Sequence, residues 1–338
     1  MVSLYLTFVI CVIAFLVTVL GTPILIRATK SKGIVGKDVH KKDRPEVAEL
    51  GGLAIAAGIV VAILFALGVN SFATLRLMFG IEQDALIVTY LLAALSIILM
   101  IELVGFVDDI LGVSQRIKLI LPIAAALPLM ALKIASLDPL VIPLIGALPL
   151  NPLIYILVLL PIGMTAATNL TNTFAGFNGM ESAMGAIIAS VLFVLGWHMN
   201  LFIVMILSAA LLGALLAFLV FNWYPSKIFP DDVGTLLIGC MIAVIVIIGK
   251  IEFAGALLLL PHIIDFVFFK VPNRLPQEVA QPWTSVLKEG DKLYPPKKSV
   301  TLAQALMRIF GGLSERNLVL MLMGIEVVLG LIVLGLYW

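Results

Sequence analysis

Two pairs of adjacent aspartates stand at the ends of long apolar stretches. Asp108 and Asp109 close one stretch, and Asp231 and Asp232 precede another. A carboxylate at the end of a helix faces the negative pole of the helix dipole, which costs stability. A metal ion, or the basic residues that follow the first pair, such as Lys118, could offset that cost. The first pair therefore predicts a site that binds something.

Amide oxygens gather in another stretch of the chain. Residues 169–180 contain three asparagines and two glycines, a composition that suits a tight loop close to a ligand. Carboxylate and amide oxygens are ligands that suit Mg²⁺, which completes its shell with water and substrate phosphates. Lys118 and Arg274 could hold phosphate oxygens. Together these residue types predict phosphoryl transfer, in which positioning and charge neutralisation supply most of the catalysis.

A structural interpretation competes with this chemistry. Interfacial aspartates can simply mark where helices leave a bilayer, and the asparagine-rich segment can be an ordinary turn between two helices. The functional interpretation is favoured because both aspartate pairs, the asparagines and Lys118 are predicted on one face of the membrane. An ionisable residue within a membrane segment is by default a hypothesis of function.

The composition indicates the fold class. The chain has 338 residues, 62% hydrophobic and 12% charged, whereas a soluble domain carries about 25% charged residues. The prediction is an all-α polytopic membrane protein that forms one domain over residues 1–338. The first apolar run is too long for a signal peptide and lacks preceding basic residues, so we expect a retained helix. Cys11 and Cys240 lie inside apolar runs, and no disulfide or metal site is inferred from them.

Ten segments are long and apolar enough to span a bilayer, which takes about 20 residues. They are 4–26, 51–69, 85–106, 117–136, 152–168, 180–199, 201–220, 233–249, 251–269 and 318–337. A loop over residues 270–317 separates the last two.

The basic residues predict the topology. All but three of the 21 lysines and arginines fall in odd-numbered loops; the exceptions are Arg76, Lys133 and Lys250. By the positive-inside rule those loops are cytoplasmic and both termini lie outside. The odd-numbered loops also carry the aspartates and asparagines. We therefore expect a multi-pass cell-membrane protein whose active site faces the cytoplasm.

Several motifs resemble one enzyme family. They are residues 105–109 followed by Lys118, and the stretches 169–180, 222–227, 229–236 and 311–318. Together they resemble the polyprenyl-phosphate N-acetylhexosamine-1-phosphate transferases, and most of all the branch that makes dolichyl-diphospho-GlcNAc. The resemblance extends over nearly the whole chain. Compact loops, without the insertions of eukaryotic relatives, indicate a prokaryotic, archaeal member.

The resemblance implies an activity. UDP-GlcNAc and a polyprenyl (dolichyl) phosphate would give polyprenyl-diphospho-GlcNAc and UMP, the first membrane step of lipid-linked glycan assembly for N-glycosylation. Mg²⁺ is the implied cofactor, with Mn²⁺ as a substitute. The expected partners are the two substrates, membrane lipid and a second copy in a homodimer, with no nucleic acid. Whether the lipid phosphate attacks directly or through an aspartyl-phosphate stays open.

The resemblance also implies roles for individual residues. Asn172 and Asp232 would hold the metal; Asp108, Asp109 and Lys118 would be catalytic; Glu49, Gly176, Asn178 and Phe229 would line the uridine pocket; and Arg274 would contact GlcNAc. One residue departs from the family pattern, because Asp231 stands where the family usually has glycine.

Two alternatives remain. Within the same class, the chain could be a bacterial-type transferase that uses another UDP-N-acetylhexosamine for cell-wall or surface polysaccharide. In a different class, it could be an ion-coupled transporter with Glu102, Asp108, Asp109 and Asp265 as a relay. Transporters usually have two related halves and a site at the bilayer midplane. Here no repeat is found, and the polar clusters lie at one interface.

His262 and Asp265, three residues apart, are expected to pair.

Overall fold

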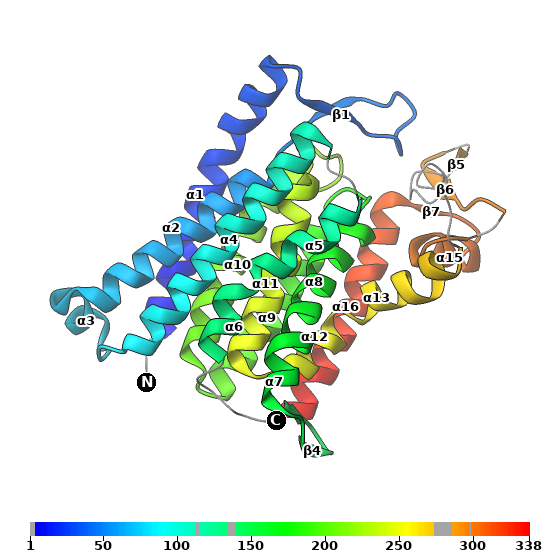
Figure 1. Cartoon of the computed structure of the whole chain (residues 1–338). Coiled ribbons are helices and arrows are strands. Elements are labelled where there is room, and N and C mark those ends of the chain that lie inside the picture. The colour runs from blue at the N-terminus through cyan, green and yellow to red at the C-terminus, as the bar shows by residue number, and fades with distance from the viewer. Residues whose placement is uncertain (1–3, 113–114, 134–139, 274–285, 289, 298) are drawn as a thin grey trace.

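A computed structural model describes residues 4–112, 115–133, 140–273, 286–288, 290–297 and 299–338; for 115–119, 273 and 286–288 it describes the backbone only. Helices dominate these residues, as predicted (Figure 1). Eight are long and apolar enough to cross a membrane: α1 (Leu4–Ser31), α2 (Gly52–Ser71), α4 (Ala85–Leu111), the combined span Pro152–Phe174, α9 (Met180–His198), α10 (Phe202–Asn222), α11 (Asp231–Gly249) and α16 (Glu315–Tyr337). The combined span consists of α7 (Pro152–Ile154), the π-helix η1 (Tyr155–Leu159) and α8 (Leu160–Phe174).

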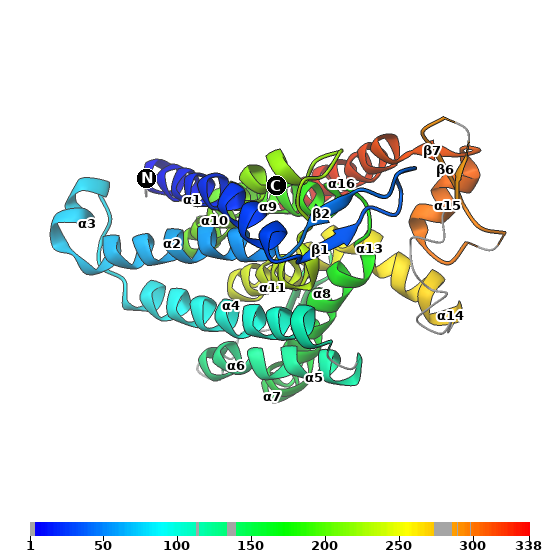
Figure 2. The ribbon, with the colours of Figure 1, turned by 90° about the horizontal axis from the view of Figure 1, so that it is seen from above.

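The helix α11 forms the centre of the bundle. Every residue from Val233 to Gly249 is buried, which is expected of a helix that is apolar on all sides. Helices α2, α4, α8, α9 and α10 pack around it (Figure 2). The backbones approach closely at the start of α11, because a Cβ at Gly105 in α4 would lie only 2.6 Å from the Cα of Val233. The position of α11 is therefore coupled directly to α4.

Two predicted spans differ from continuous helices. The ninth is bent by 64° between α12 (Glu252–Leu258) and Leu260–Lys270, which comprises α13 (Leu260–Ile264) and the π-helix η2 (Asp265–Lys270). The short α14 (Val271–Asn273) follows. Pro261 explains the break, since it has no amide hydrogen to continue the helical ladder.

The fourth predicted span is likewise divided. It consists of α5 (Gln115–Ala125) and α6 (Leu127–Lys133), and the apolar part Ile120–Lys133 is shorter than a spanning helix. Proline again accounts for the interruption, because Pro128 cannot donate a hydrogen bond to the preceding helix. The total of ten spans therefore stays a prediction. A further short helix, α3 (Ala73–Phe79), follows α2.

The strands are few and short. They form the hairpin β1 (Val35–Lys37) and β2 (Glu46–Ala48), the hairpin β3 (Leu140–Ile142) and β4 (Gly146–Leu148), and the sheet of β5 (Val286–Lys288), β6 (Lys292–Tyr294) and β7 (Leu313–Ser314). All these pairs are antiparallel. The last sheet and α15 (Leu302–Ile309) lie between the last two spans. The first hairpin lies in the first loop, the segment between α1 and α2, and the residues around it form part of the candidate site.

Candidate active site

One cavity of about 480 Å³ collects most of the predicted site residues. It lies where the first loop meets the end of α8 and the start of α11. Six predicted residues line it: Glu49, Asn172, Gly176, Asn178, Phe229 and Asp232. They come from three odd-numbered loops and the helix ends beside them, so the structure brings together segments far apart in the sequence.

One corner of this cavity offers oxygen ligands for a cation. The hydroxyl of Thr235 lies 3.1 Å from Oδ1 of Asn172 and so joins α8 to α11. The same hydroxyl lies 3.4 Å from the carbonyl oxygen of Asp232. Asn172 and Asp232 both line the cavity, and their amide and carboxylate oxygens are ligands that fit Mg²⁺, with water and phosphate completing the shell. The residues present therefore fit the implied metal.

Asp109 caps the start of α11. Its two carboxylate oxygens accept hydrogen bonds from the backbone amides of Asp232 at 3.2 Å and Val233 at 3.1 Å. These amides belong to the positive end of the α11 dipole, where a carboxylate is stabilised. The cost of placing Asp109 at the end of α4 is therefore offset by another helix. Both carboxylate oxygens are thus engaged by the backbone of Asp232 and Val233, and Asp109 is not among the described residues that line the cavity.

Asp231 has a structural partner, although it neighbours Asp232. Its carboxylate accepts a hydrogen bond from the backbone amide of Leu50, which ties the end of the first loop to α11. Its backbone is left-handed, with φ 54°, a conformation that favours glycine and that Asp tolerates better than most residues. This conformation gives a physical reason why glycine suits the position and why Asp can replace it.

Glu49 and Phe229 form another wall of the cavity. The backbone amide of Phe229 donates to the carbonyl of Ala48 at 2.8 Å, and the amide of Gly51 donates to the carbonyl of Phe229 at 2.9 Å. These bonds hold the segment before α11 against the first loop. Burial raises the pKa of the Glu49 carboxyl above its ordinary value. Glu49 and the Phe229 ring thus face the cavity from a paired, ordered backbone.

The loop between α8 and α9 supplies a third wall. The amide of Gly176 donates to Oε1 of Glu181 at 2.8 Å. Asn178 is buried, and its Oδ1 accepts from the backbone amide of Ser226 at 2.8 Å. The asparagine therefore joins two of the loops that the motifs identified, in addition to lining the cavity.

Four predicted catalytic or binding residues are not placed in this lining. Asp109 is not among the described lining residues, because its carboxylate accepts from the backbone amides of α11. Arg274 lies outside the described residues, as does the side chain of Lys118 in α5. Asp108 is buried at the end of α4 and is not part of the lining formed by the described residues. Their roles stay predictions.

The expected pairing of His262 with Asp265 is wrong. The carboxylate of Asp265 instead bonds Lys270 at 2.8 Å and the amide of Leu302 at 2.7 Å. His262 packs against Phe174, with ring centroids 4.6 Å apart. Residues three apart were expected to meet on a continuous helix, but the π-helix that begins at Asp265 alters the spacing.

The sequence interpretation missed the part of the first loop that lines the cavity. Gly36, Asp38 and His40 belong to this lining, together with Glu181 and Thr235. Apart from Glu49, the first loop served only as a marker of topology, because it is rich in lysine and arginine. A histidine and an aspartate two residues apart within that basic loop were the available signal. Both side chains prove to be buried.

Comparisons with known proteins agree with the family resemblance of the sequence motifs. The family model described as "Glycosyl transferase family 4" matches residues 91–250, which include Asp109, Asn172 and Asp232. A protein of Sulfolobus acidocaldarius is 34% identical over 95% of this chain and 93% of its own length. A protein of Saccharolobus solfataricus is 30% identical over the same shares. The names of both propose a UDP-N-acetylglucosamine–dolichyl-phosphate N-acetylglucosaminephosphotransferase.

Bacterial cell-wall enzymes are similar over a smaller part of the chain. The phospho-N-acetylmuramoyl-pentapeptide-transferase of Streptococcus pyogenes is 29% identical over 272 residues, 78% of each chain. The similarity to the two archaeal proteins thus covers more of the sequence than the similarity to this bacterial enzyme.

Proposed function

Because the chain belongs to glycosyl transferase family 4, we propose that it transfers GlcNAc-1-phosphate from UDP-GlcNAc to a polyprenyl (dolichyl) phosphate and releases UMP. The product would be the polyprenyl-diphospho-GlcNAc that starts lipid-linked glycan assembly. Two relatives with names that propose this activity match over 95% of the chain, which supports the substrates. The multi-pass membrane fold suits an enzyme with one lipid substrate.

One observation of the structure carries this proposal. The oxygen corner of Asn172 and Asp232 and the wall of Glu49 and Phe229 share a single cavity. A nucleotide sugar has the matching chemistry, because it carries an aromatic base at one end and an anionic diphosphate in the middle. A cavity of about 480 Å³ also falls within the usual range of roughly 300–1,000 Å³ for small-molecule sites.

The chemistry needs little more than positioning. An oxygen of the lipid phosphate would attack the β-phosphorus of UDP-GlcNAc, and the bond from that phosphorus to the UMP oxygen would break. A phosphate monoester has a second pKa of about 6, so the nucleophile is already dianionic near neutral pH. No side chain has to act as a base. Phe229 would stack on uracil, with Glu49, Gly176 and Asn178 around the nucleoside.

Asn172 and Asp232 would hold Mg²⁺, or Mn²⁺ in its place. A bound divalent cation supplies charge neutralisation for the diphosphate and the UMP leaving group. Asp109 would act as a positioning residue, because its bonds to the amides of Asp232 and Val233 orient the start of α11.

Further roles are proposed from the family resemblance. Lys118 would contact phosphate, Arg274 would contact GlcNAc, and Asp108 would support the acidic site. The cavity would open to the cytoplasm, because the basic residues concentrate in the loops at its end of the bundle. We also propose that the protein forms a homodimer.

Turnover of the purified protein in detergent tests this function. With Mg²⁺ and dolichyl phosphate, we expect UMP release from UDP-GlcNAc to exceed release from UDP-glucose or UDP-MurNAc-pentapeptide by at least about tenfold, a difference of ~1.4 kcal/mol. EDTA should abolish release, and Mg²⁺ or Mn²⁺ should restore it. A preference for the pentapeptide substrate with undecaprenyl phosphate would favour the bacterial-type alternative. Unchanged release in EDTA would refute the metal assignment.

A further inference from the structure

Lys41 of the first loop meets Glu315, the first residue of α16, beside the cavity. The Lys41 ammonium pairs with Oε2 of Glu315 and lies 3.3 Å from Oδ2 of Asp38. It also lies 3.4 Å from Oδ1 of Asn178 and 4.1 Å from the centre of the Tyr224 ring. One cation thus contacts the first loop, the α8–α9 loop, the segment before α11 and the last helix.

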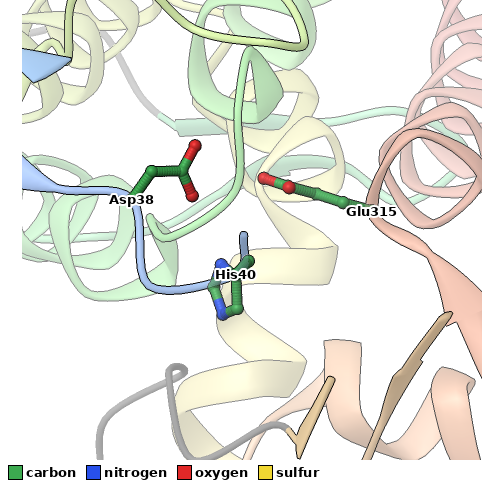
Figure 3. Close-up of side chains that lie close together, drawn as sticks. All are labelled: Asp38, His40 and Glu315. Atoms are coloured by element: carbon green, nitrogen blue, oxygen red, sulfur yellow. The ribbon is translucent and has the colours of Figure 1, made fainter. Parts of the chain in front are cut away.

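The side chains beside Lys41 have the spacing of a metal site, but the Lys41 ammonium already supplies the positive charge there. Ligand atoms of Asp38, His40 and Glu315 lie within 4.8 Å of one another, and the two carboxylates point toward each other (Figure 3). The Lys41 ammonium bonds both carboxylates, so their charge is compensated by the chain itself. Asp38 and Glu315 are each only 3% exposed, so either charge would be costly without this partner.

The contacts continue from this ion pair into the walls of the cavity. Oε1 of Glu315 accepts from the amide of Asn178 at 2.8 Å, and Asn178 in turn accepts from the amide of Ser226 at 2.8 Å. The His40 ring stacks on Phe177 with centroids 4.7 Å apart and planes 17° apart. Both rings line the cavity. The ion pair therefore joins the first loop to the two other loops that enclose the cavity.

We propose that the Lys41–Glu315 ion pair is a positioning device that holds residues 36–40 as a wall of the substrate cavity. This inference rests on the proposed function. Neither Lys41 nor Glu315 belongs to the lining that the described residues form, so both act through their neighbours. Loss of Lys41 leaves the buried Glu315 carboxylate without its cation, and loss of Glu315 leaves the half-buried Lys41 ammonium with Asp38 alone. Opening the first loop to water relieves either cost. Substrate binding should then weaken, whereas the chemical step in the closed state should not.

Steady-state kinetics of single and double variants tests the ion pair. For Lys41→Met and Glu315→Gln, we expect the KM for UDP-GlcNAc to rise at least about tenfold, ~1.4 kcal/mol, while kcat changes less than about threefold. The double variant should lose no more than the more impaired single variant, because both substitutions disrupt one interaction and the double change leaves neither charge of the pair without its partner. Lys41→Arg keeps the charge and should recover most of the affinity. Lys42→Met is the matched control, since Lys42 is the exposed neighbour and should behave as wild type.

Several results would overturn the proposal. A KM for Glu315→Gln equal to that of Lys42→Met would do so, as would fully additive losses in the double variant. If Lys41→Met does not fold, Glu315→Gln and Lys41→Arg still decide the question.

A second measurement separates this inference from the proposed function, because it needs no turnover. Tryptic cleavage after Lys42 should be at least about fivefold faster in Glu315→Gln than in wild type, since the first loop opens. Equal cleavage rates would overturn the ion-pair role. Absence of turnover in the wild type would contradict the proposed function alone.

Discussion

Replacement of Asp232 with asparagine should lower UMP release on the order of 10³-fold, or ~4 kcal/mol of transition-state stabilisation. Asp232 and Asn172 are the two proposed protein ligands of the metal, and the substitution removes the only anionic one. The loss should fall on kcat as well as on the apparent affinity for Mg²⁺. Initial rates over a range of Mg²⁺ concentrations measure both.

Asp231→Asn is the matched control for this variant. The neighbouring carboxylate is engaged by the amide of Leu50, and the oxygen of asparagine can accept the same hydrogen bond. Asparagine also tolerates the left-handed backbone at this position. Activity within about threefold of wild type is therefore expected. If Asp231→Asn loses activity and Asp232→Asn keeps it, the ligand assignment is reversed.

Asp109→Asn should lower turnover on the order of 10²-fold through misplacement of the start of α11. The carboxylate accepts from two amides, whereas asparagine offers one oxygen and turns an NH₂ group toward the other amide. A donor left unsatisfied there costs roughly 1–3 kcal/mol. Both kcat and the midpoint of thermal unfolding should fall, and a combined kinetic and unfolding measurement in detergent records the two effects.

The control is an aspartate-to-asparagine substitution at Asp84, the N-cap of α4. Asp84 caps that helix and accepts from the amides of Leu86 and Ile87, but it is exposed and far along the helix from Asp109. Asp84→Asn should leave kcat unchanged, because an asparagine is also a good N-cap residue. Wild-type kcat in Asp109→Asn would show that the capping contact does not position the site.

The sequence was sufficient to predict which loops converge. Hydropathy located the eight long apolar helices, and the distribution of basic residues assigned the odd-numbered loops to one side. Asn172, Asn178 and Asp232 then follow as neighbours, and the structure places all three around one cavity. These residues were predictable because their motifs are local and their helices begin and end where hydropathy changes.

The partner of Asp109 was not predictable in the same way. A carboxylate at the carboxyl end of a helix is unfavourable, which indicated a nearby cation. The groups that stabilise Asp109 are instead backbone amides at the amino end of α11, 123 residues further along the chain. That contact depends on how closely α4 and α11 pack, which Gly105 permits and which no local pattern reports. Lys41 was not predictable for a related reason. One lysine among the seven basic residues of 27–50 gives no sign that it is the one that pairs with Glu315.

Transfer of a labelled phosphate tests the central claim most directly. Purified protein would be incubated with Mg²⁺, dolichyl phosphate and UDP-GlcNAc that carries ³²P in the β-phosphate. GlcNAc-1-phosphate transfer moves that phosphorus into the lipid, so the label should appear in the organic phase in a 1:1 ratio with released UMP. Label that stays in water as UDP would show transfer of the sugar without its phosphate. Label that stays in intact UDP-GlcNAc would show that no transfer takes place, and either result would contradict the account.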